Sequence, residues 1–199
     1  MSDVAREVGV AKGTLYGYVE SKESLFVLCL RSADVAQPID VPEILPVATP
    51  AFGETLTWVK ARLAEELSWP SLLEAIQLDR APDIRAELEL IIGEFYDLLY
   101  ANKCRIKLLD RSADHAELGR LWQTEGREQP RLAFSRYLES RIASGRIREL
   151  PDLPLATRIM VETCTTWAVH IHWDRNPETF DPASARANAI DFLVRGFIA

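Results

Sequence analysis

The feature that most restricts the fold of this chain is a run of prolines at four-residue intervals: Pro38, Pro42, Pro46 and Pro50. Proline lacks a backbone N–H and clashes with the preceding helical turn, so a helix cannot continue through this stretch. Gly53 closes it. The stretch predicts a domain boundary, with a helical domain and linking helix over residues 1–36, a proline-rich linker over 37–53 and a second domain over 54–199.

The segments on either side of the linker are predicted to be helical. Leu, Ala, Glu and Arg recur throughout, and alternating runs of β-branched residues are absent. Pro82 is suited to the first turn of a long helix whose apolar face carries Ile84, Leu88, Ile91, Ile92, Phe95 and Leu99. Asp152 and Pro182 open two further helices. The expected fold class is all-α.

Composition excludes several kinds of protein. A net charge of −7 argues against a general nucleic-acid coat or a membrane-surface protein, since both need a broad positive field. The three cysteines are an odd number and lie far apart in the sequence, which is typical of reduced thiols in the cytoplasm. The longest uncharged run, residues 163–173, is much shorter than the roughly 20 residues that a membrane span needs. A cytoplasmic protein with no membrane partner is expected.

The N-terminal residues have the pattern of a helix-turn-helix. Val4, Ala5 and Val8 form an apolar face on a first helical piece, and Gly9 permits the tight turn after it. A second helix is expected over residues 12–19, and Ser21 is suited to cap a third. The second helix would present short polar and aromatic groups to a DNA major groove, namely Lys12, Thr14, Tyr16 and Tyr18.

Residues 4–26 resemble the DNA-binding signature of the TetR/AcrR family of bacterial transcriptional regulators. The Gly-Val, Thr-Leu-Tyr, aromatic and Ser-Lys-Glu elements occur in order at the family's spacing. The resemblance implies that Thr14, Tyr16 and Tyr18 contact DNA and that Lys22 grips a phosphate at the start of the third helix, where the helix dipole assists. A small helical cap with surface tyrosines is the alternative interpretation.

The sequence departs from the family pattern in two places. Val19 stands where the family more often has Phe. Family members also have a complete helix before the supporting helix, whereas Met1 falls almost at its start here. We therefore expect incomplete cover over the apolar residues of the helix-turn-helix and weak operator binding by this 199-residue form.

Residues 54–199 resemble the family's ligand-binding and dimerisation domain in architecture. The resemblance implies a pocket between the helices, and Pro130 marks a place where helix packing must open. The expected lining is Phe95, Leu99, Trp122, Phe134 and Trp167, with Glu125 as a polar anchor. An apolar or aromatic small molecule is the expected effector. The alternative is that these aromatic residues are simply core.

The last predicted helix carries an apolar stripe at spacings of three and four residues: Ala183, Ala187, Ile190, Val194 and Phe197. We expect this stripe to form a homodimer interface as part of a four-helix bundle. In the alternative, the stripe packs within its own subunit.

No nucleophile–base motif, phosphate loop or metal-ligand spacing occurs, so no catalytic residue, metal or cofactor is predicted. The expected function is that of a transcriptional regulator, a repressor that a small ligand releases from a pseudo-palindromic double-stranded operator. A dimeric small-molecule-binding protein with lost or weakened DNA binding is the alternative.

Overall fold

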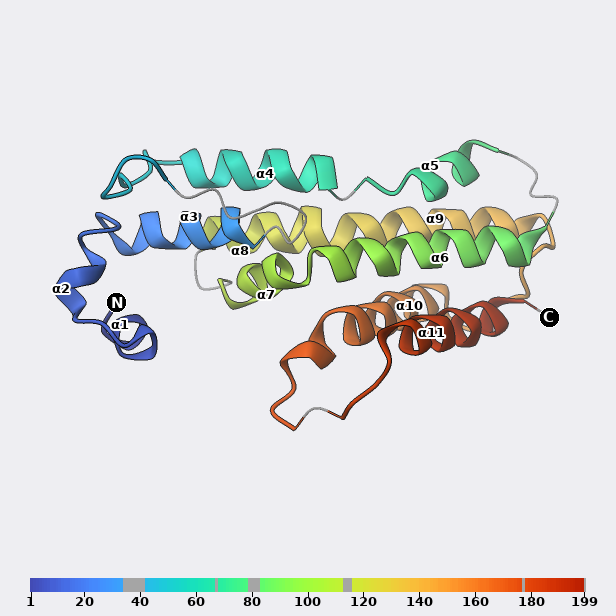
Figure 1. Cartoon of the computed structure of the whole chain (residues 1–199). Coiled ribbons are helices and arrows are strands. Elements are labelled where there is room, and N and C mark those ends of the chain that lie inside the picture. Colours follow the sequence, from blue (N-terminus) through green and yellow to red (C-terminus); the bar gives the residue numbers. More distant parts are fainter. Residues whose placement is uncertain (34–41, 67, 79–82, 113–115, 177, 199) are drawn as a thin grey trace. The chain divides into compact units, whose positions relative to one another are not determined.

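The computed structural model describes residues 1–33, 42–66, 68–78, 83–112, 116–176 and 178–198 (Figure 1). Within these ranges the regular structure consists of helices, and Val19 and Val47 form an isolated bridge, which confirms the all-α class. The chain divides into two compact units, Met1–Arg62 and Leu63–Ala199. Pro38 and Pro82 lie outside the described residues. None of the described helices is long and apolar enough to cross a membrane.

The first unit begins with the helix-turn-helix expected from the sequence. Its helices are α1 (Ser2–Val8), α2 (Lys12–Leu15) and α3 (Lys22–Ser32). Gly9 ends α1 with a φ of 75°, a left-handed conformation that glycine adopts without steric cost. The N–H groups of Gly9 and Val10 donate back to the carbonyls of Arg6 and Ala5, in the pattern of a Schellman cap.

Helix α2 is shorter than the predicted residues 12–19. Its α-helical part ends at Leu15, and the chain continues in tighter turns in which the N–H groups of Gly17 and Tyr18 donate to the carbonyls of Thr14 and Leu15. Glycine is a poor helix former, and Gly17 stands two residues after the C-terminal residue of α2. The sequence pattern correctly placed the helix but overestimated its regular length.

The residues after α2 pair with the linker. Val19 forms a parallel bridge with Val47, and the N–H of Val47 donates to the carbonyl of Tyr18 at 2.8 Å. The N–H of Glu20 donates to the carbonyl of Val47 at 3.0 Å. Residues 42–53 are therefore irregular in structure but bonded to the helix-turn-helix. They precede α4 (Glu54–Glu66).

The second unit consists of helices joined by short connections. They are α5 (Pro70–Gln77), α6 (Ile84–Ala101), α7 (Lys103–Arg111), α8 (Ala116–Leu121), a π-helix η1 (Trp122–Glu128), α9 (Gln129–Ala143), α10 (Leu153–Ala168), a 3₁₀ turn η2 (His170–Trp173) and α11 (Pro182–Phe197). Asp152 caps α10 by accepting from the N–H of Leu155, as the sequence predicted. Helix α6 contacts α5, α7, α10 and α11, so it is the central element of this unit.

An aromatic cluster fills the core between α5, α6 and α9. The indole of Trp69 stacks on Phe95 at a centroid distance of 4.5 Å and on Phe134 at 5.7 Å. Its N–H donates to the carbonyl of Ile91 at 2.8 Å, which satisfies the polar atom of that buried ring. Phe197 approaches Phe134 edge-on from α11. The cluster therefore joins four helices of the unit.

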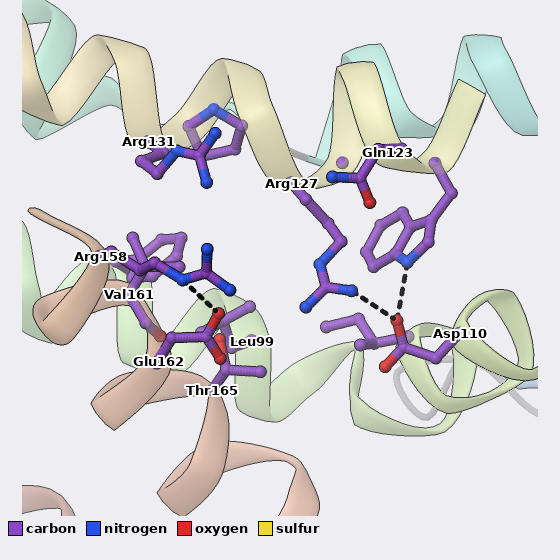
Figure 2. A pocket seen from close by; sticks show the side chains of 14 residues that line it. Leu99, Asp110, Gln123, Arg127, Arg131, Arg158, Val161, Glu162 and Thr165 are labelled. Carbon is purple, nitrogen blue, oxygen red and sulfur yellow. Dashed lines mark hydrogen bonds and ion pairs between the residues drawn. The ribbon is translucent and has the colours of Figure 1, made fainter. Parts of the chain in front are cut away.

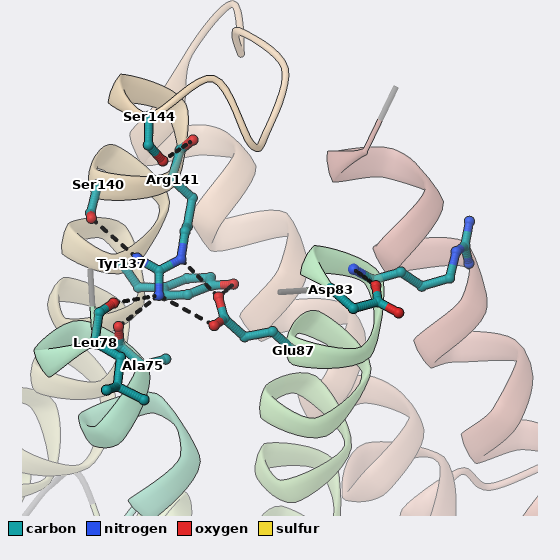
Figure 3. Close-up of polar contacts among 9 residues, drawn as sticks. Ala75, Leu78, Asp83, Glu87, Tyr137, Ser140, Arg141 and Ser144 are labelled. Carbon is teal, nitrogen blue, oxygen red and sulfur yellow. Dashed lines mark hydrogen bonds and ion pairs between the residues drawn. The ribbon is translucent and has the colours of Figure 1, made fainter. Parts of the chain in front are cut away.

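A buried ion pair connects α6 and α9 (Figure 3). Arg141 is only 2% exposed, and its Nε donates to Oε1 of Glu87 at 2.8 Å. Its Nη2 donates to the carbonyls of Ala75 and Leu78, at the end of α5. The same guanidinium therefore neutralises a carboxylate and satisfies carbonyls that the helix itself leaves without donors.

The helix around Pro130 is not broken: residues 116–143 are helical without a gap, and the helical period changes before the proline. Pro130 stands in the first turn of α9 and cannot donate to the carbonyl of Gly126, four residues earlier. The preceding turn widens into the π-helix η1. A Cβ added to Gly126 would overlap the indole ring of Trp122, so glycine is what permits this ring to lie against the helix.

Candidate DNA interface and ligand cavity

The predicted DNA-contacting side chains lie at the surface of the helix-turn-helix. Lys12 and Thr14 are exposed on α2, and the side chains of Tyr16 and Tyr18 in the turns after it are 43% and 56% exposed. Leu15 and Val19, which lie beside them in the sequence, are buried. The segment therefore directs its apolar side chains inward and its hydroxyl and amino groups toward solvent, where a duplex could be contacted.

Lys22 occupies the first position of α3, and its side chain is exposed. Ser21 and Ser24 form a capping box there: the N–H of Ser24 donates to Oγ of Ser21 at 3.1 Å, and the N–H of Ser21 donates to Oγ of Ser24 at 2.9 Å. The cap satisfies backbone N–H groups at the start of α3, where Lys22 lies. A cation there is suited to a phosphate contact.

Acidic side chains are also exposed in the helix-turn-helix. Glu7 and Glu23 are exposed on α1 and α3. Glu20 accepts a hydrogen bond from the N–H of Thr49 at 2.8 Å, so its carboxylate is committed to the linker. The local field is thus not broadly positive, and DNA affinity would depend on a few placed cations.

A cavity of about 290 Å³ lies within the second unit, between α6, α7, η1, α9 and α10 (Figure 2). Its apolar wall includes Phe95, Leu99, Ile106, Trp122 and Val161. The indole N–H of Trp122 donates to Oδ1 of Asp110 at 2.8 Å, which fixes the ring as one side of the cavity. The volume is near the lower end of the roughly 300–1,000 Å³ found for small-molecule sites.

Only some of the residues that were predicted to line the ligand cavity lie together in the structure. Phe95, Leu99 and Trp122 line the cavity. Phe134 is fully buried in the aromatic cluster and does not reach the cavity, and Glu125 is exposed and is not part of its lining. In η1, Gly126 rather than Glu125 faces Trp122.

Trp167 lines a second hollow, of about 230 Å³, together with Tyr96, Tyr100, His172 and Phe180. Its ring meets Phe180 edge-on at 5.4 Å, and its carbonyl accepts from the hydroxyl of Tyr96 at 3.2 Å. Burial is the main cause that lowers the pKa of His172, and the charge of Lys103 adds to it. Trp167 is therefore separated from the other predicted lining residues.

The charged residues that line the first cavity were not predicted from the sequence. Arg127 and Arg131 reach into it from η1 and α9, and Arg158 reaches in from α10 (Figure 2). The available signal was the position of Arg127 and Arg131, four residues apart on either side of Pro130. Arg158 had no comparable local signal, because only the packing of α10 brings it to the same cavity.

The predicted dimer residues separate into two groups. Ile190, Val194 and Phe197 are buried within the subunit, against the elements that α11 contacts, so the expectation that they face a partner is wrong for these three. Ala183 and Ala187 are exposed. The large apolar side chains that α10 and α11 leave at the surface are Leu155, Ile159 and Phe192.

Among the described residues, no group of three or more His, Cys, Asp or Glu side chains is placed to hold a metal ion. His170 and His172, the histidines of η2, lie within a single short turn.

The helix-turn-helix with its exposed polar face defines a DNA-binding protein. Residues 1–29 match the family model described as bacterial regulatory proteins, tetR family. The N-terminal helix-turn-helix is therefore similar to that of this family, which supports a DNA-binding transcriptional regulator. The match covers the helix-turn-helix segment, and no curated protein matches the chain.

Proposed function

We propose that this regulator is a cytoplasmic repressor that binds a pseudo-palindromic operator as a homodimer and is released by a small molecule. The observation that carries the proposal is the exposed face of the α2 segment, with Lys12, Thr14, Tyr16 and Tyr18, in a family-matched helix-turn-helix. A cavity of about 290 Å³ in the second unit supports the effector part. Release requires that the effector bind the DNA-free conformation more tightly than the DNA-bound one.

The proposed dimer uses the outer faces of α10 and α11. Phe192 is 75% exposed, and Leu155 and Ile159 are also largely exposed, which is costly for side chains of this size unless another surface covers them. We expect Ile159→Glu and Phe192→Glu to convert a dimer into a monomer in light scattering coupled to size exclusion. The matched control is Leu90→Glu, at an exposed apolar position of α6. Unchanged dimer mass in both test variants would contradict the proposed interface.

The operator can be identified by selecting binding sites from a library of random DNA duplexes. We expect two half-sites with centres about 34–36 Å apart, or a multiple of this, and two chains per duplex. Affinity should fall steeply with salt, because Lys12 and Lys22 would displace counterions. No sequence preference after selection would contradict the repressor proposal.

One alternative is a dimeric small-molecule-binding protein whose DNA binding is lost or weakened. The acidic residues Glu7, Glu20 and Glu23 within the helix-turn-helix favour it, because they repel the DNA backbone. Failure to select any duplex, together with saturable binding of a small molecule, would support this alternative over the repressor.

A further inference from the structure

The cavity between α6, α7, η1, α9 and α10 carries an excess of positive charge. Three arginines line it, Arg127, Arg131 and Arg158, against two carboxylates, those of Asp110 and Glu162. The whole chain has a net charge of −7, so this local balance is opposite in sign to that of the protein. Positive charge gathered within a hollow of an acidic protein favours an anionic ligand there.

The two carboxylates already have partners. Asp110 accepts from the indole of Trp122 at 2.8 Å and lies 3.9 Å from Nη1 of Arg127. Glu162 pairs with Arg158 at 3.6 Å, one turn away on the same helix. Among the described residues, Arg131 forms no hydrogen bond or ion pair, although it is partly buried at the cavity. The cavity thus contains one guanidinium without an anion.

The rest of the lining is suited to an apolar body. Leu99, Ile106 and Val161 contribute aliphatic surface, and Phe95 and Trp122 contribute aromatic rings. Figure 2 shows Arg131 above and Arg158 below it on facing sides of the cavity, with Val161 and Leu99 on the side of Arg158. A ligand could therefore place its apolar part against these side chains and its charged group beside the arginines.

We propose that the effector is a small organic anion, an apolar and preferably aromatic body carrying one carboxylate or sulfonate that pairs with Arg131. This inference rests on the proposed function and adds an anionic group to the apolar or aromatic effector expected from the sequence. The planar guanidinium binds two oxygens of one oxyanion group through parallel N–H donors, a contact roughly twice as strong as a neutral hydrogen bond. A cationic ligand is disfavoured, because the two carboxylates are occupied and the remaining side chain would repel it.

The test compares two fluorescent probes that share one body. Anilinonaphthalene sulfonate carries an anionic group, and phenylnaphthylamine is the same aromatic amine without it. We expect the unmodified chain to bind the sulfonate at least about tenfold more tightly than the neutral amine. Arg131→Gln should remove this preference, because it weakens the sulfonate about tenfold or more and leaves the affinity for the amine unchanged.

Two further variants identify the site. Arg136→Gln changes an exposed arginine of the same helix that does not line the cavity, and it should behave as the unmodified chain. Val161→Trp should weaken both probes, because a larger side chain fills the cavity. Circular dichroism and unfolding midpoints of each variant check that the fold is retained. Equal affinity of the unmodified chain for the two probes, or an Arg131→Gln effect equal on both, would overturn the proposal.

Measuring DNA binding on the same protein preparations distinguishes failure of the anionic-effector proposal from failure of the repressor proposal. If the chain binds its selected duplex but has equal affinity for the two probes, the repressor proposal is supported and the anionic effector is contradicted. If the chain selects no duplex but prefers the sulfonate through Arg131, the anion site is supported and the repressor proposal is contradicted.

Discussion

Nε of Arg141 donates to Oε1 of Glu87 at 2.8 Å in the interior of the second unit, fifty-four residues away in the chain. The hydroxyl of Tyr137 donates to the same carboxylate oxygen at 2.8 Å. The carboxylate is therefore held by a cation and a neutral donor, and the cation also serves the carbonyl of Ala75. Because several partners depend on one guanidinium, its removal has a large effect.

Arg141→Met should lower the free energy of unfolding by about 3–5 kcal/mol, because it leaves the Glu87 carboxylate buried without its counter-ion. Urea denaturation followed by circular dichroism measures this. The matched control is Arg85→Met, which removes a more exposed 3.6 Å pair with Glu89 on α6 and should change stability by less than about 1 kcal/mol. Similar losses of unfolding free energy in both variants would show that the buried ion pair stabilises the protein no more than the exposed one.

The raised pKa of Tyr137 leads us to expect a loss of stability at alkaline pH. Burial first, and then the hydrogen bond to Glu87, raise the pKa of Tyr137 well above its ordinary value of about 10. Above pH 10 the unfolded chain therefore loses this proton while the folded chain keeps it, so stability falls as pH rises, by up to about 1.4 kcal/mol per pH unit.

Tyr137→Phe should remove this part of the alkaline slope in denaturation curves recorded between about pH 9 and pH 11, on either side of the ordinary tyrosine pKa. The comparison of both proteins at neutral pH, where the tyrosine is protonated in both states, isolates the loss of the hydrogen bond itself. Parallel slopes at alkaline pH would contradict the assignment.

Gly126→Ala should displace the indole of Trp122 and destabilise the protein by about 1–3 kcal/mol, because the new Cβ would overlap the ring. The shift in tryptophan fluorescence and the urea midpoint report it. In a Trp122→Ala background the same change should be harmless, since the obstructing ring is gone. Gly196→Ala is the control, because its Cβ meets no atom within 4 Å in α11. A loss that persists without Trp122 would indicate another cause.

Lys22→Gln should weaken binding to every duplex by a similar factor and reduce the salt slope of log affinity by about 1, because one phosphate contact is lost. Fluorescence anisotropy at several salt concentrations measures both quantities on the selected operator and on a scrambled duplex. Lys60→Gln, at an exposed lysine of α4, is the matched control. A change confined to one sequence would instead assign Lys22 to base recognition.

Short-range features were predictable from the sequence. The φ of Gly9 and the cap at Ser21 follow from residues close together in the chain, because each depends on local backbone geometry. The pattern that buries Leu15 and exposes Tyr16 is equally local. The helix-turn-helix and its resemblance to the family were recognised from these features.

The cavity was only partly predictable. Phe95 and Trp122 line it as expected, as does Leu99, whereas Phe134 and Trp167 do not. Glu125 was expected there as a polar anchor, but residues 122–128 form a wide π turn, and the exposed Glu125 is not part of the lining. One such turn changes which residues share a face, and a sequence count cannot detect it.

By itself, the amino-acid order determined that this protein is helical and begins with a DNA-reading motif, because turns, caps and helical periodicity act over a few residues. Only the tertiary structure decided that Ile190 and Phe197 enter the subunit's own core, and that Arg131 and Arg158 meet at one cavity. An apolar stripe is equally suited to its own subunit or a partner, and residues distant in the chain become neighbours only through helix packing.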